Sequence, residues 1–75
     1  MTIRAFRNLP WDVRQKMIQQ VDDFLTRRIL EIAFLGDGRI SWAQVACRIG
    51  GGNSPESIRK RTVRIIKCFD QNVQA

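Results

Sequence analysis

Residues 40–69 read ISWAQVACRIGGGNSPESIRKRTVRIIKCF, and this stretch decides the fold. Ser41 and Gln44 have the spacing of a capping box, in which each side chain bonds the backbone N–H of the other residue. Apolar residues then recur at helical spacing, and they are Trp42, Val45, Ala46 and Ile49. Three consecutive glycines, 50–52, end this helix because glycine reaches left-handed backbone conformations without a Cβ clash. The pattern predicts a short helix followed by a sharp turn.

A second helix is predicted to begin directly after this turn. Ser54 is a candidate N-cap, Pro55 suits the first turn, and Glu56 complements the positive end of the helix dipole. One face is apolar and consists of Ile58, Thr62, Ile65, Ile66 and Phe69. The opposite face carries Lys60, Arg64 and Lys67, with Ser57 and Val63 beside them, while Arg59 and Arg61 flank the apolar face. Two helices around a tight turn predict a helix-turn-helix, with Trp42, Val45, Ile49, Ile58, Ile65 and Phe69 in the core.

The chain upstream supplies the remaining scaffold. A helix start at Pro10 is followed by an apolar stripe that could continue to Leu35, about 25 residues or 37 Å, or break near Thr26. Residues 36–38 form a turn by composition. We therefore predict an all-α, tri-helical helix-turn-helix bundle over residues 10–69, with a long or broken N-terminal helix. Residues 1–9 are predicted to be a flexible basic arm and residues 70–75 a loose tail.

Two features of this upstream region leave alternatives open. Arg4 and Arg7 are typical of basic arms that enter a minor groove, but Ile3 or Phe6 could instead anchor the segment on the core. Leu30 and Phe34 lie off the main apolar stripe, so the end of their helix is apolar nearly all round. Either the following helices of the same chain cover these side chains, or a second copy does so in a homodimer.

The charge of the second helix of the motif points to a nucleic-acid partner. From Pro55 to Lys67 there are five cations, Arg59, Lys60, Arg61, Arg64 and Lys67, against the single acid Glu56. Lysine and arginine attract phosphates, and arginine can also bond guanine bidentately in the major groove. We expect Lys60 and Arg64 to face the groove of double-stranded DNA. Arg61, Lys67 and Arg48 are expected to contact phosphates, with Ser57 at the same surface.

The motif also resembles a known family. Trp42-x-x-Val45-Ala46-x-x-Ile49 resembles the middle of a Myb/SANT repeat, Ile58-Arg59-Lys60-Arg61 resembles the start of its third helix, and Asp22-Asp23 resembles the acidic start of its first. The resemblance covers residues 21–69, about two thirds of the chain. It keeps one of the usual three tryptophans, since the third position falls on Thr62, and its turn is one residue longer. The resemblance implies DNA binding and transcription regulation, with Arg59, Lys60, Val63 and Arg64 at base-reading positions.

Composition narrows the functional classes further. The 75 residues suit one small domain, and the formal charge of +6 favours an anionic partner. With no histidine and two cysteines the chain cannot complete a four-ligand zinc site, and it lacks an imidazole base, so we expect neither a metal, a cofactor nor an enzyme. Two reduced thiols, no targeting segment and no long apolar run predict an intracellular, non-membrane protein in the nucleus, nucleoid or cytoplasm, not a secreted one.

A second function remains open beside DNA binding. The chain could be a protein-interaction module, or a small inhibitor that docks on an acidic surface of a larger protein. An exposed apolar patch around Leu30, Phe34 or Trp11 would favour a protein partner, whereas a basic ridge along residues 55–69 would favour DNA. RNA binding ranks lower because exposed aromatic platforms are not evident in the sequence.

Overall fold

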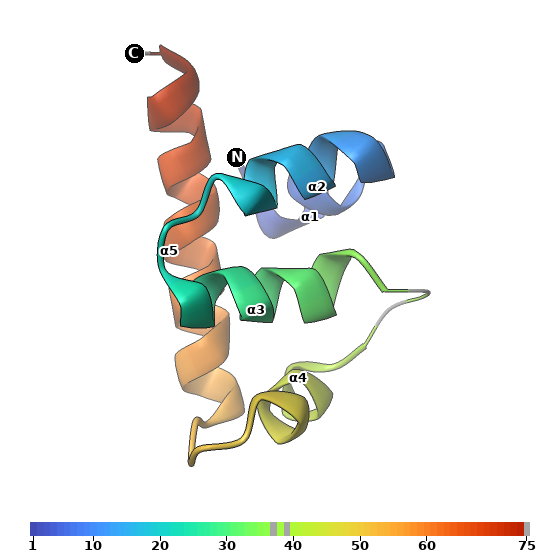
Figure 1. Cartoon of the computed structure of the whole chain (residues 1–75), viewed down its shortest axis with the longest axis vertical. Coiled ribbons are helices and arrows are strands. Elements are labelled where there is room, and N and C mark those ends of the chain that lie inside the picture. The colour runs from blue at the N-terminus through green and yellow to red at the C-terminus, as the bar shows by residue number, and fades with distance from the viewer. Residues whose placement is uncertain (37, 39, 75) are drawn as a thin grey trace.

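The computed structural model describes residues 1–36, 38 and 40–74, with side chains described through Phe69 (Figure 1). This part of the chain is all-α, as predicted, and contains no strand. Its helices are α1 (Ile3–Arg7), α2 (Trp11–Gln19), α3 (Phe24–Phe34), α4 (Trp42–Ile49) and α5 (Pro55–Gln74). Asp37, within the predicted turn at residues 36–38, and Ala75, in the predicted tail, lie outside the described residues.

The long helix α5 forms one side of the molecule, and α2, α3 and α4 are stacked crosswise against it (Figure 1). α3 is the centre of the stack, since it packs against α2, α4 and α5. α1 packs against α5. The core lies between the stacked helices and α5, and its fully buried side chains include Ile18, Ile29, Val45, Ile58 and Ile66.

The N-terminal segment is a helix anchored in the core, so the predicted flexible arm at residues 1–9 is wrong. Thr2 caps α1 by accepting a hydrogen bond from the N–H of Ala5 at 3.0 Å. Phe6 is 0% exposed, and its ring meets Phe34 edge-on at 4.9 Å and stacks on Phe69 at 5.5 Å between centroids. Burial of an aromatic ring outweighs the usual looseness of a chain end. The alternative, in which Phe6 tucks onto the core, is confirmed.

The upstream helix is broken near Thr26, which was the second of the two predicted alternatives. α2 ends at Gln19, and Asp23 caps α3 by accepting hydrogen bonds from the backbone N–H of Thr26, at 2.9 Å, and from its hydroxyl. The first N–H groups of a helix have no carbonyl partner within the helix, and the Asp23 carboxylate accepts from one of them, that of Thr26. The local cap therefore overrides the continuous apolar stripe and separates α2 from α3.

The surplus apolar face of α3 is covered by the same chain. Leu30 is 0% and Phe34 2% exposed, and Phe6 of α1 supplies one of the rings against Phe34. These two residues therefore require no second copy to cover them. Of the predicted core residues, Val45, Ile58 and Phe69 are buried, but Trp42, Ile49 and Ile65 are half-buried at the core's edge.

The predicted helix-turn-helix signals form the expected local contacts. The capping box between Ser41 and Gln44 is complete at the start of α4. The backbone reverses through three glycines with φ of 71°, 70° and 78°, and the Asn53 amide closes the turn by donating to the Gly50 carbonyl at 3.0 Å. Ser54 Oγ accepts from the Ser57 N–H at 3.1 Å and caps α5. The turn therefore delivers α4 directly to the basic helix, whose backbone stays helical to Gln74.

Candidate nucleic-acid interface

The solvent side of α5 holds a polar hollow that we call the basic hollow. It has a volume of about 350 Å³ and is lined by Ser54, Glu56, Ser57, Lys60, Arg61 and Arg64. The spacing of four residues keeps positions 56, 60 and 64 on one side of the helix. Ile58, Thr62 and Ile66 are buried on the opposite side, which orients the hollow outward. Four of the predicted DNA-binding residues, Ser57, Lys60, Arg61 and Arg64, therefore meet at one surface.

A carboxylate lies among these cations. Glu56 Oε1 is 2.8 Å from Arg59 Nη2 and 3.9 Å from Lys60 Nζ. The hydrogen bond and charge of Arg59, helped by Lys60, lower the pKa of Glu56, and the same bond raises the pKa of Arg59. Glu56 was predicted only as a complement to the helix dipole, not as a site residue. The sequence could have indicated this pairing, because Arg59 and Lys60 follow Glu56 by three and four residues, the spacing at which side chains meet on a helix.

Arg61, which was predicted to contact a phosphate, also makes contacts within the protein. Its Nη1 donates to Thr26 Oγ1 at 3.2 Å and lies 3.4 Å from Asp23 Oδ2. Asp23 has a lowered pKa, because the Thr26 hydroxyl and N–H both donate to it and Arg61 adds its positive charge. The side chain of Arg61 stays 44% exposed. It therefore joins α5 to the first turn of α3, at one wall of the basic hollow.

The remaining predicted site residues on α4 and α5 lie outside the lining of the basic hollow. Lys67 is exposed on α5 beyond Arg64, and Arg59 flanks the hollow through its bond to Glu56. Val63 is half-buried. Arg48 is exposed in the last turn of α4. Lys67, Arg59 and Arg48 are therefore exposed but do not line the hollow.

Arg4 and Arg7 belong to the helix α1, so they do not lie on the irregular arm that was predicted to reach a minor groove. The Arg7 guanidinium lies 5.5 Å from the centroid of the Phe34 ring, a cation–π contact. Both arginines line a hollow of about 480 Å³ together with Ile3 and Asn8. Phe6 holds this segment at Phe69, nine residues or roughly 14 Å along α5 from Lys60. Their cationic side chains are thus held near the far half of α5.

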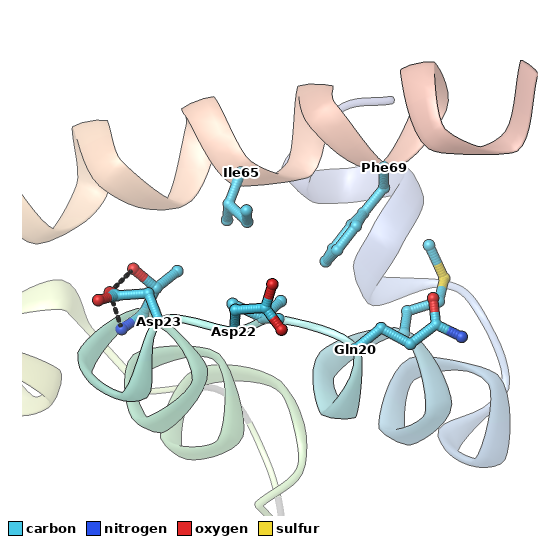
Figure 2. Close-up of a pocket in the computed structure, with 8 residues that line it drawn as sticks. Gln20, Asp22, Asp23, Ile65 and Phe69 are labelled. Atoms are coloured by element: carbon cyan, nitrogen blue, oxygen red, sulfur yellow. Dashed lines mark hydrogen bonds between the residues drawn. The ribbon is translucent and has the colours of Figure 1, made fainter. Parts of the chain in front are cut away.

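A third hollow, of about 420 Å³, lies between α5 and the connection of α2 to α3. Figure 2 shows Ile65 and Phe69 of α5 facing Gln20, Asp22 and Asp23 across it. Carboxylates at this rim repel phosphate, so the hollow does not extend the cationic surface. Sequence reasoning missed it because it forms only where α5 crosses that connection.

Three large apolar side chains are exposed, and Trp11 is one of the positions at which an exposed patch would favour a protein partner. Phe24, the first residue of α3, is 72% exposed, and Val13 is also exposed. Trp11 is about half exposed, and its indole N–H donates to the Leu35 carbonyl at 3.1 Å. Leu30 and Phe34, whose exposure would have favoured a protein partner, are buried.

Within residues 1–36, 38 and 40–74, no three histidine, cysteine or acidic side chains come together as a metal site. Cys47 is exposed and Cys68 half-buried, and both are free thiols. Among the helices of this described part, none has the length and apolar character needed to cross a bilayer.

Comparisons with protein-family models, curated proteins and solved structures give no significant match.

Proposed function

We propose that this protein binds double-stranded DNA with α5 in the major groove. The observation that carries the proposal is the basic hollow, where Lys60 and Arg64 meet on the outer side of a capped helix directly after a tight turn. The major groove is about 12 Å wide and admits one α-helix. A helix that is buried on one side and cationic on the other has the shape and charge for this position.

Each cation has a proposed role that follows from its surroundings. Lys60 and Arg64 face the groove, while Lys67 and Arg48 contact phosphates at its edges. Ser54 and Ser57 bring the N-terminal turn of α5 to the DNA backbone, where hydroxyl donors can bond phosphate oxygens. Arg61 mainly fixes α5 against α3 and so orients the surface.

The resemblance to Myb/SANT repeats belongs to the same proposal. The three helices α3, α4 and α5 would correspond to the helices of the repeat, and the buried Thr62 would stand at its third tryptophan position. Regulation of transcription inside the cell is the biological role that this resemblance favours. A binding role without catalysis is in keeping with the absence of histidine from the chain.

The test is binding to random-sequence duplex DNA over a series of salt concentrations. The variant Lys60→Ala/Arg64→Ala removes the two cations proposed to face the groove, so it should bind duplex DNA more weakly. Its slope of log affinity against log salt should fall by less than about 1.8, the reduction that two lost phosphate contacts would give. The matched control is Lys16→Ala/Arg28→Ala, which removes two exposed cations from α2 and α3. This control should keep the wild-type slope. Absence of binding at low salt, or the same reduction in both variants, would contradict DNA binding by α5.

A protein partner is the second candidate, and the exposed ring of Phe24 is the observation that favours it. In this case the chain would be an interaction module, or an inhibitor whose cations meet an acidic surface of a larger protein. Phe24→Ala would then weaken capture of an acidic protein partner. The same variant should leave the affinity for duplex DNA unchanged, which separates the two candidates. A homodimer would be detected as a doubled mass in solution.

A further inference from the structure

The carboxylate of Glu56 is unexpected in a surface that would bind only phosphates. Its side chain is 62% exposed, lies in the first turn of α5 and lines the basic hollow together with Lys60 and Arg64. A negative charge here repels the DNA backbone and partly neutralises two neighbouring cations. A favourable interaction with the helix dipole accounts for an acid in the first turn, but not for its place among groups that would face DNA.

We infer that Glu56 determines sequence specificity by accepting a hydrogen bond from the exocyclic amine of a cytosine. This inference rests on the proposed DNA binding and names a base that the site would select. Residues at the N-terminus of a recognition helix are those that meet base edges, and Glu56 is the second residue of α5. Its ion pairs keep it ionised, so it can only accept hydrogen bonds.

The major-groove edges of the bases make this choice selective. Guanine and thymine present acceptors at the groove centre, which repel a carboxylate. Adenine presents a donor beside an acceptor, whereas cytosine presents its amine without a neighbouring acceptor on the same base. Cytosine is therefore the base that an ionised glutamate favours.

The ion pair with Arg59 adds a second element of the same recognition. The bond of 2.8 Å holds the guanidinium beside the carboxylate and limits the rotamers of both side chains. A guanidinium donates to the two acceptors of guanine. The pair Glu56 and Arg59 thus presents an acceptor and a donor side by side, which complements a cytosine and a guanine that are adjacent in the groove.

The experiment is selection of bound duplexes from a random library at about 50 mM salt, a concentration at which phosphate contacts are strong. The wild type should enrich sites that carry a cytosine at one position. Glu56→Gln keeps the side-chain shape but adds donors, and glutamine pairs with adenine, so the preference at this position should move from cytosine to adenine by at least about fivefold. Circular dichroism and melting curves check that each variant is folded.

The matched control is Asp12→Asn, which removes an exposed acid from the first turn of another helix, α2. It should keep the cytosine preference. Identical base preferences in the wild type and Glu56→Gln would overturn the role of Glu56 while leaving DNA binding intact. Enrichment of no base at any position would overturn this inference, and the absence of any bound duplex would overturn DNA binding as well. A shift in both variants would show a general effect of charge and would also overturn the inference.

Discussion

The most informative perturbation of the fold is Phe6→Ala. The ring is fully buried and contacts Phe34 of α3 and Phe69 of α5, so its loss removes both transfer free energy and packing from the core. Truncation of a buried phenylalanine costs about 3–5 kcal/mol. A chain of 75 residues has a free energy of unfolding of roughly 4–11 kcal/mol at typical values per residue. The variant should therefore lose about a quarter or more of its free energy of unfolding, and it should be partly unfolded at the lower limit.

The assay is urea denaturation followed by far-ultraviolet circular dichroism. Phe6→Ala should lower the denaturation midpoint with little change in slope, because most of the buried surface is unchanged. Phe24→Ala is the matched control, since this ring is largely exposed, and it should change the free energy of unfolding by less than about 0.5 kcal/mol. A loss below about 1 kcal/mol for Phe6→Ala would refute the anchoring of α1 and would restore a loose N-terminal arm.

The other predictions concern the turn and the first turn of α3. Gly51→Ala forces a Cβ into a backbone with φ of 70°, so it should cost about 1–2 kcal/mol, measured by thermal denaturation. Gly36→Ala, whose new Cβ would meet only ordinary contacts, should be nearly neutral, and equal losses would contradict the strain argument. The lowered pKa of Asp23 means that its hydrogen bonds with Thr26 and its ion pair with Arg61 stabilise the fold above the ordinary pKa of 3.8. This contribution to stability should be lost as the pH falls through the lowered pKa of Asp23 in the folded state. The melting temperature of Asp23→Asn should therefore fall less steeply in acid than that of the wild type.

The parts of the fold that could be predicted are those whose contacts lie within three or four residues. The capping box of Ser41 and Gln44 and the cap of α5 by Ser54 each join residues three apart. The reversal through residues 50–52 depends on the absence of Cβ atoms at these positions. Such features are determined by residue types and spacing, so the sequence alone predicts α4, the turn, α5 and the basic outer face of α5.

The tertiary structure decided what depends on contacts distant in sequence. Phe6 joins the core only because α3 and α5 bring Phe34 and Phe69 together around it. Arg61 reaches Thr26 across 35 residues, which no periodicity indicates. The burial of an apolar side chain depends on which other helices pack over it. Leu30 and Phe34 are therefore buried, whereas Trp42 lies half-buried at the edge of the core. The chain itself determined which helices form and which face is cationic, whereas packing determined which side chains remain available to a partner.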